Sequence, residues 1–230
     1  MVYGLLLGAL AGVPLGYVPW ADFPLSDARR SGVLSPTFGT SNKVGVDLSV
    51  PYYFNLAPNY DDTLTLRYMG LRGLQVRNEA RYIGPNYRGF SYLEYMPNDQ
   101  VEQRSRYAGN IRDDRTFGNG WSSNISFAGI SDPRYFTDLS TRLALTSQVN
   151  LPRQGSITYA GGGWWNVTGM LQSFQTLPDT LTGVRTEPYK RLPQITLNAL
   201  RPDMPFGSTF QLASEFVNFT HPSQTEGRRL

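Results

Sequence analysis

The chain has 230 residues, a formal net charge of +3, no cysteine, and a composition that is 13% aromatic but only 17% charged. Without cysteine it can form neither disulfides nor thiolate metal sites, and it has no cysteine nucleophile. The basic residues form no run of five, which argues against nucleic-acid binding. Many aromatics together with 23 Gly and 16 Pro favour numerous short strands over helices.

The first predicted element is the apolar run Met1–Tyr17. It is shorter than the roughly 20 residues of a membrane-spanning helix. It also lacks the Lys or Arg that precedes the apolar core of a signal peptide. A buried strand, or the ragged start of a truncated reading frame, is favoured over a cleaved signal or a membrane helix.

Beyond this run the hydrophobic period is mostly two. Val44, Val46, Leu48 and Val50 alternate with small or polar residues, and the pattern returns over 63–68 and 195–199. Such alternation predicts a sheet with one apolar and one polar face. No segment has a three-four repeat long enough for a helix, so the predicted fold class is all-β.

Turn signals divide the chain into about a dozen strands. They lie at Ser41–Asn42, Pro58–Asn59, Leu71–Gly73, Gly84–Asn86, Pro97–Asp99, Asp113–Asp114, Asp132–Pro133, Arg153–Gly155, Pro178–Asp179 and Pro202–Asp203. Many of the strands between them are near the 9–11 residues that a tilted strand uses to cross a bilayer. Both a soluble sandwich or small barrel and part of a transmembrane barrel fit this pattern.

Aromatic residues near the predicted strand ends favour the membrane architecture modestly, with ordinary core packing as the alternative. Outer-membrane barrels carry girdles of such residues at both water interfaces. The candidates are Tyr52–Phe54, Tyr82, Tyr92, Tyr95, Tyr135–Phe136, Trp164–Trp165, Phe216 and Phe219.

The sequence offers little for catalysis. His221 is the single histidine, and a solvent-exposed tail position is expected for it. The pairs Asp61–Asp62 and Asp113–Asp114 fall at or near predicted turns, and adjacent strand residues point to opposite faces, so neither forms an acid–base pair. Gly161–Gly163 lacks the Lys-Ser/Thr of a phosphate loop and predicts a bend or close packing under Trp164 and Trp165. We therefore expect no catalytic residue, metal site or cofactor, and no enzyme activity.

Two prolines, Pro36 and Pro51, lie inside the first two predicted strands of the main series, where a proline removes a ladder donor. Their surroundings carry a family resemblance. The blocks are YVPWADFPLSDARRSGVLSP at 17–36, VPYYFNLAPNYDDTLTLRYMGLRGLQV at 50–76, EYMPND at 94–99 and SDPRYFTDLS at 131–140. From about Val13 onward the chain resembles the LptD family of LPS-assembly proteins.

The resemblance implies an antiparallel transmembrane β-barrel in the outer membrane of a Gram-negative bacterium, of which this chain looks like an incomplete part, a fragment or a truncated reading frame. Residues 1–30 would be a lead-in, the remnant of a jellyroll-to-barrel connection, and 31–230 the amino-terminal part of the barrel. Residues 1–12 do not look like the end of the family's jellyroll. The implied function is insertion of lipopolysaccharide into the outer leaflet, with no covalent chemistry.

The implied partners are lipopolysaccharide, an LptE-type plug lipoprotein, and an LptA-type periplasmic bridge that would be reached through the jellyroll. In the family, prolines in the first two barrel strands weaken a lateral gate between the first and last strands, and Pro36 and Pro51 match them. Arg29 and Arg30 would contact lipopolysaccharide phosphates or else form a solvated periplasmic hinge. A passive porin or sugar-binding outer-membrane barrel is the alternative, and a soluble β-sandwich a third interpretation.

Overall fold

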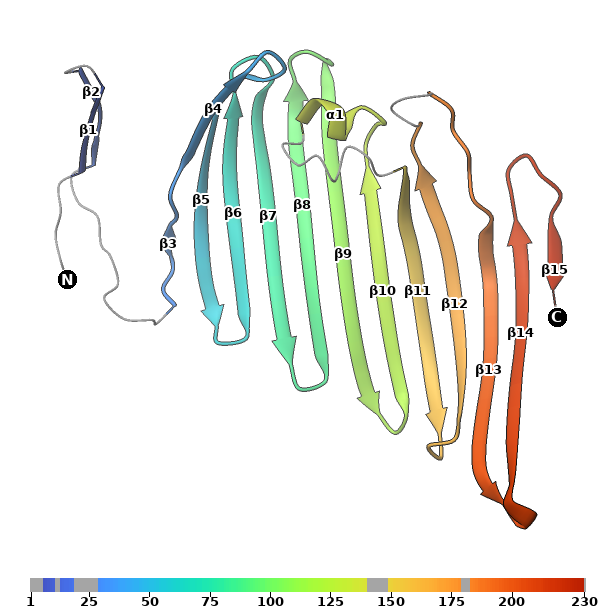
Figure 1. Cartoon of the computed structure of the whole chain (residues 1–230). Helices are drawn as coiled ribbons and strands as arrows, with labels where there is room; N and C mark the ends of the chain where they lie inside the picture. Colours follow the sequence, from blue (N-terminus) through green and yellow to red (C-terminus); the bar gives the residue numbers. More distant parts are fainter. Residues whose placement is uncertain (1–5, 11–12, 19–28, 140–148, 179–182, 230) are drawn as a thin grey trace.

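The computed structural model describes residues 6–10, 13–18, 29–139, 149–178 and 183–229. One antiparallel sheet of thirteen strands dominates it (Figure 1), and almost every strand pairs with its neighbours in sequence. Its strands are β3 (Gly32–Val33), β4 (Thr37–Ser41), β5 (Gly45–Ala57), β6 (Tyr60–Met69), β7 (Gly73–Gly84), β8 (Tyr87–Asp99), β9 (Arg104–Gly118), β10 (Trp121–Ile130), β11 (Asn150–Gly161), β12 (Trp165–Thr176), β13 (Lys190–Met204), β14 (Ser208–Thr220) and β15 (Gly227–Arg229). Because β3 and β4 both pair with β5, they are two halves of one strand. The all-β class and the dozen strands are confirmed.

The amino-terminal apolar run forms strands where it is described. β1 (Leu6–Leu10) and β2 (Val13–Val18) pair antiparallel in a sheet of their own. Of the rest of the predicted lead-in, Arg29 and Arg30 are described, and residues 1–5, 11–12 and 19–28 lie outside the described residues. Within the described part of the chain, no helix is both long and apolar enough to cross a bilayer.

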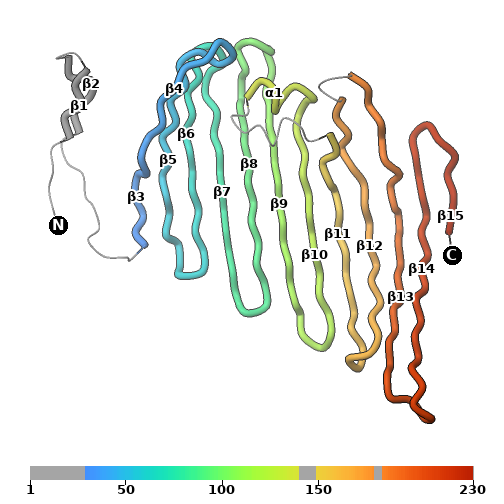
Figure 2. Tube along the Cα trace, viewed as in Figure 1, coloured from blue at the N-terminus to red at the C-terminus, as the bar shows by residue number. Residues whose placement is uncertain are grey.

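The two ends of the sheet differ in their connections, as Figure 2 shows. At one end the hairpins close through two or three residues, at 58–59, 85–86, 119–120, 162–164 and 205–207. We call it the turn end. The opposite end, which we call the loop end, carries the connections 42–44, 70–72, 100–103, 131–149, 177–189 and 221–226. Gly162 and Gly163 form one of the hairpin turns with φ of 56° and 75°, and the Trp165 ring lies against Gly161, so the predicted bend and close packing are confirmed.

The sheet has one polar and one apolar face, as the alternation predicts. The polar face carries, among others, Asp47, Arg67, Gln75, Arg77, Glu94, Arg106, Arg112, Asn124, Gln154 and Gln172. The apolar face leaves large side chains exposed on most strands, including Val46, Leu48, Leu66, Leu74, Leu93, Ile111, Ile125, Phe127, Ile157, Leu171 and Ile195. A water-soluble monomer rarely exposes an apolar surface that runs across so many strands.

The buried core lies at the loop end, under the connection between β10 and β11. That connection contains the short helix α1 (Tyr135–Leu139), which folds over the polar face. Its Tyr135 and Leu139 are buried together with Val44, Met69, Met96, Ala108, Ile130, Leu151 and Leu177. Tyr135 is therefore a core residue, and its predicted place among strand-end girdle aromatics is wrong.

Two predicted turns, Pro97–Asp99 and Pro202–Asp203, lie in the last residues of β8 and β13, beside the observed turns, and two more fall in strand interiors. Asp113–Asp114 lies within β9, and Arg153–Gly155 lies within β11. The reason is cross-strand pairing: Asp114 accepts hydrogen bonds from Arg88 on β8 at 2.9 Å and from Asn124 on β10 at 2.6 Å. A carboxylate held in this way is compatible with a strand interior, where an unpaired aspartate is disfavoured.

Candidate functional site: a proline seam and an ion-paired connection

The first strand pairs irregularly with the second around the two prolines. Val33 lies opposite Tyr52 and Thr37 lies opposite Ser49. Three residues, Leu34–Pro36, therefore face only two, Val50–Pro51. The result is a β-bulge of one extra residue in the first strand. We call these five residues the proline seam.

The hydrogen bond that remains in the proline seam shows which ladder Pro51 weakens. The Leu34 N–H donates to the Pro51 carbonyl at 2.9 Å. In an antiparallel strand the N–H and C=O of one residue point to the same neighbour. The donor that Pro51 lacks is thus on the side of the first strand. On the other side, Pro51 keeps its register with Thr65 of β6 without a shift.

The structure places Arg29 and Arg30 at the turn end, where the chain approaches β3. Arg29 lies 3.4 Å from the Asp61 carboxylate, which also receives a hydrogen bond from Arg81 at 2.8 Å. The side-chain amide of Asn55 donates to the Arg29 carbonyl at 2.9 Å and holds this segment against β5. The Arg29 side chain stays 62% exposed, and Arg30 is also exposed.

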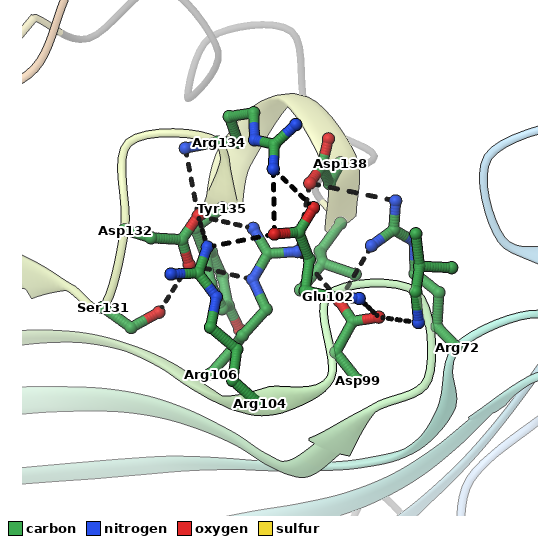
Figure 3. Close-up of polar contacts among 12 residues, drawn as sticks. Arg72, Asp99, Glu102, Arg104, Arg106, Ser131, Asp132, Arg134, Tyr135 and Asp138 are labelled. Atoms are coloured by element: carbon green, nitrogen blue, oxygen red, sulfur yellow. Dashed lines mark hydrogen bonds and ion pairs between the residues drawn. The ribbon is translucent and has the colours of Figure 1, made fainter.

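At the loop end, five charged residues form a buried group that we call the ionic cluster: Arg72, Asp99, Arg106, Asp132 and Asp138 (Figure 3). Arg106 is fully buried and donates to both oxygens of Asp132, through Nε at 2.9 Å and Nη2 at 2.8 Å. Its Nη1 donates to Asp99 at 2.9 Å and to Asp138 at 3.1 Å. One arginine of the sheet therefore binds both ends of the 132–138 segment.

The remaining members satisfy the other polar atoms of the ionic cluster. Arg72 donates to Asp99 at 2.8 Å and, through Nε, to the Lys43 carbonyl at 3.0 Å. Burial alone would raise the pKa of Asp132, but hydrogen bonds from Arg106 and Ser131 outweigh it and hold that pKa below its ordinary value. The carboxylate is thus charged across the physiological range.

A second contact region continues the attachment of α1 along the polar face. Arg67 forms a two-pronged ion pair with Asp47, at 2.8 Å and 2.6 Å, and also donates to the Leu139 carbonyl at 2.9 Å. The Tyr135 hydroxyl donates to Glu94 at 2.7 Å and accepts from Gln75 at 2.9 Å. Burial and the nearby Glu94 charge raise the pKa of Tyr135, which therefore stays a neutral hydrogen-bond donor.

Sequence reasoning did not identify the ionic cluster. Its five members come from four separate segments, and no local spacing links Arg106 with Asp132. The one sequence feature that could have indicated it is the SDPRYFTDLS block, which contains Asp132 and Asp138 of the cluster and the neighbouring Tyr135. This block combines an Asp-Pro turn with charged and aromatic residues.

The expectation for His221 is wrong, because its side chain is buried. Its Nδ1 accepts from the backbone N–H groups of Ser223, at 3.1 Å, and Gln224, at 2.9 Å, and its Nε2 lies 2.9 Å from the Glu187 carbonyl. These partners fix the neutral tautomer with hydrogen on Nε2, and the ring joins two loop-end connections. Among the described residues, no group of three His, Asp or Glu side chains could hold a metal ion.

Comparisons with known proteins agree with this architecture. Residues 104–230 match the family described as LPS transport system D, and residues 1–128 match the family described as LptD protein. The match begins at residue 1, so the likeness extends further toward the amino terminus than the motifs indicate, and it includes residues 1–12.

Individual relatives carry the same description. The chain is 45% identical over 219 residues to the LPS-assembly protein LptD of Azoarcus sp. (strain BH72) and 46% identical over 219 residues to that of Aromatoleum aromaticum. It is 41% identical over 223 residues to that of Nitrosospira multiformis. The alignments cover 94% of this chain but 27%, 27% and 24% of these relatives, so the chain spans about a quarter of their length. On two family matches that together cover its whole length, the chain belongs to the LptD family.

Proposed function

We propose that this chain forms the amino-terminal part of the wall of an outer-membrane barrel, and that the complete barrel inserts lipopolysaccharide into the outer leaflet. The broad exposed apolar face supports the membrane placement. Two tyrosine rows border it, with Tyr68, Tyr95 and Tyr107 toward the loop end and Tyr60 and Tyr87 toward the turn end. Tyr60 and Tyr68 are eight residues apart, as are Tyr87 and Tyr95, which is about 27 Å along a strand. A tilt of about 40° reduces this to roughly 21 Å, close to the roughly 25 Å of an outer-membrane barrel's apolar band.

The connections suggest the orientation. Outer-membrane barrels have short periplasmic turns and longer extracellular loops. By this rule the turn end faces the periplasm and the loop end faces outward. Arg29, just before the first strand, then lies on the periplasmic side, where a preceding jellyroll that receives lipopolysaccharide from an LptA-type bridge would join.

The proline seam carries the functional proposal. Pro36 and Pro51 weaken the ladder between the first strand and the rest of the wall, so the first strand can move where the complete barrel would close on its last strand. The lipid part of lipopolysaccharide would leave sideways through that opening. Its sugars would pass along the polar face, beside an LptE-type plug, with Arg29 and Arg30 as candidate contacts for lipopolysaccharide phosphates. This transport step makes and breaks no covalent bond, so the chain would not act as an enzyme.

Proline replacement in the full-length protein tests this proposal. Pro36→Ala with Pro51→Ala restores two N–H donors, each worth about 0.5–1.5 kcal/mol. We expect lipopolysaccharide to reach the cell surface several-fold more slowly, with the protein still folded. Pro152→Ala in β11, far from the seam, is the matched control and should have no effect. Normal export by the double variant would contradict the gating role.

A further inference from the structure

We propose that the apolar face also carries a phospholipid headgroup site at its turn end, with Arg115 as the phosphate-binding side chain. The proposal uses the membrane orientation of the proposed function but concerns a different surface and a different ligand. All of its residues lie on β6 to β9, which are consecutive strands. The site therefore does not depend on how the barrel closes.

The unusual feature is a buried carboxylate on the apolar face. Asp113 is 7% exposed, and its neighbours Arg112 and Asp114 lie on the polar face. Its oxygens accept a hydrogen bond from the Tyr82 hydroxyl and one from Arg115 Nε at 2.8 Å. The Tyr82 ring reaches Asp113 across Gly89, where a Cβ would lie 2.0 Å from the ring. A charge on the membrane-facing side is costly unless it is paired or functional.

The ion pair with Asp113 orients Arg115 but does not bury its side chain. Only its Nε is directed at Asp113, and its side chain is 50% exposed. Asp113 and the Tyr82 hydroxyl therefore set the position of the guanidinium, and half of the side chain stays accessible at this surface. A guanidinium held in this way binds phosphate well, because its paired N–H donors match two phosphate oxygens.

Tyrosines complete the site. Tyr60, Tyr82 and Tyr87 pack together with ring centroids 6.0–6.3 Å apart, and the Tyr60 hydroxyl donates to the Tyr87 hydroxyl at 2.9 Å. Tyr60 and Tyr87 form the turn-end tyrosine row, and Tyr82 lies opposite Tyr60 on the neighbouring strand. All three are at the depth where lipid headgroups meet the acyl chains. The geometry favours one occupant, a phospholipid of the periplasmic leaflet, with its phosphate on Arg115 and its acyl chains along the apolar face. Lipid A phosphates would lie in the opposite leaflet, near the loop end.

Native mass spectrometry of the full-length protein in detergent tests the site, with dioleoyl phosphatidylglycerol as the titrated lipid. Arg115→Gln should weaken binding of the lipid roughly tenfold. Arg112→Gln, which makes the same charge change on the same strand but on the polar face, should leave it unchanged. Arg115→Lys should keep part of the affinity, which shows that a folded protein is being measured.

Three outcomes would overturn the proposal: equal lipid binding by Arg115→Gln and the unchanged protein, an equal loss in Arg112→Gln, or an equal loss of lipid A binding in Arg115→Gln. Lipopolysaccharide export by Arg115→Gln is expected to stay normal. Failure of the headgroup site would therefore be visible in lipid binding, and failure of the gate in export by the proline variant.

Discussion

Arg106 has a fully buried guanidinium that contacts three carboxylates, one on β8 and two on the connection that leaves β10. Burying one cation is costly, and the cost is offset only when every donor has a partner. Asp99 also accepts a hydrogen bond from a backbone N–H group, and Asp132 accepts one from a backbone N–H group and one from the Ser131 hydroxyl. The carboxylates that face Arg106 are therefore themselves hydrogen-bonded. The residue therefore acts as the point where the 132–138 segment is fixed to the sheet.

Replacement of Arg106 should be severe. Arg106→Met leaves Asp99 and Asp132 buried without their main partner, and we expect the free energy of unfolding to fall by about 3–5 kcal/mol. Arg104→Gln is the matched control, because Arg104 is 46% exposed and its ion pairs should contribute only about 0–1 kcal/mol. Urea unfolding of both variants in detergent measures the difference. A similar loss in the two variants would show that the ionic cluster is not decisive.

Gly89 is a position where a single added carbon atom would disturb the packing of a neighbouring side chain. Gly89→Ala would place a Cβ 2.0 Å from the Tyr82 ring and displace that ring from Asp113. We expect the free energy of unfolding to fall by about 1–3 kcal/mol. Gly155→Ala, also in the interior of a strand, meets nothing within 4 Å and should be neutral or slightly stabilising. Thermal unfolding compares them, and equal melting temperatures would contradict the packing of Tyr82 on Gly89.

At the scale of elements, α1 is too short to be stable alone, and its attachment to the polar face holds it in place. The attachment depends on a charged Asp132 and a neutral Tyr135. Since the pKa of Asp132 is lowered in the folded protein, its contribution to the stability of the folded state is present above the ordinary aspartate pKa of 3.8. That contribution is lost as the pH falls through the folded pKa. Since the pKa of Tyr135 is raised above 10.0, its contribution is lost only as the pH rises beyond that value.

Hydrogen exchange of residues 131–139 should therefore show constant protection between about pH 5 and pH 9, after correction for the intrinsic exchange rate. Asp132→Asn removes the charge that Arg106 binds and should lose this protection at every pH in that range. Protection that falls steeply between pH 7 and pH 5 in the unchanged protein would contradict the assignment of Asp132 as the controlling group.

At the scale of the whole molecule, much of the sheet could be predicted from the chain alone. The period-two alternation of 44–50 and the turn signals at Pro58–Asn59 and Gly84–Asn86 determine strands and faces locally. The turns predicted at Asp113–Asp114 and Arg153–Gly155 were wrong, because cross-strand partners stabilise those residues within strands. The ionic cluster could not be predicted, since Arg106 meets Asp132 and Asp138 only after β10 and its connection fold back over the polar face.

The central claim is that lipopolysaccharide leaves beside the proline seam, and photo-crosslinking in cells tests it most directly. Phe38 on β4 is 76% exposed on the apolar face, and Phe127 on β10 is 44% exposed on the same face. A benzophenone-bearing phenylalanine analogue replaces each in turn in the full-length protein. We predict lipopolysaccharide adducts at position 38 and few or none at position 127. Adducts of equal yield at both positions, or only at position 127, would contradict exit at the seam.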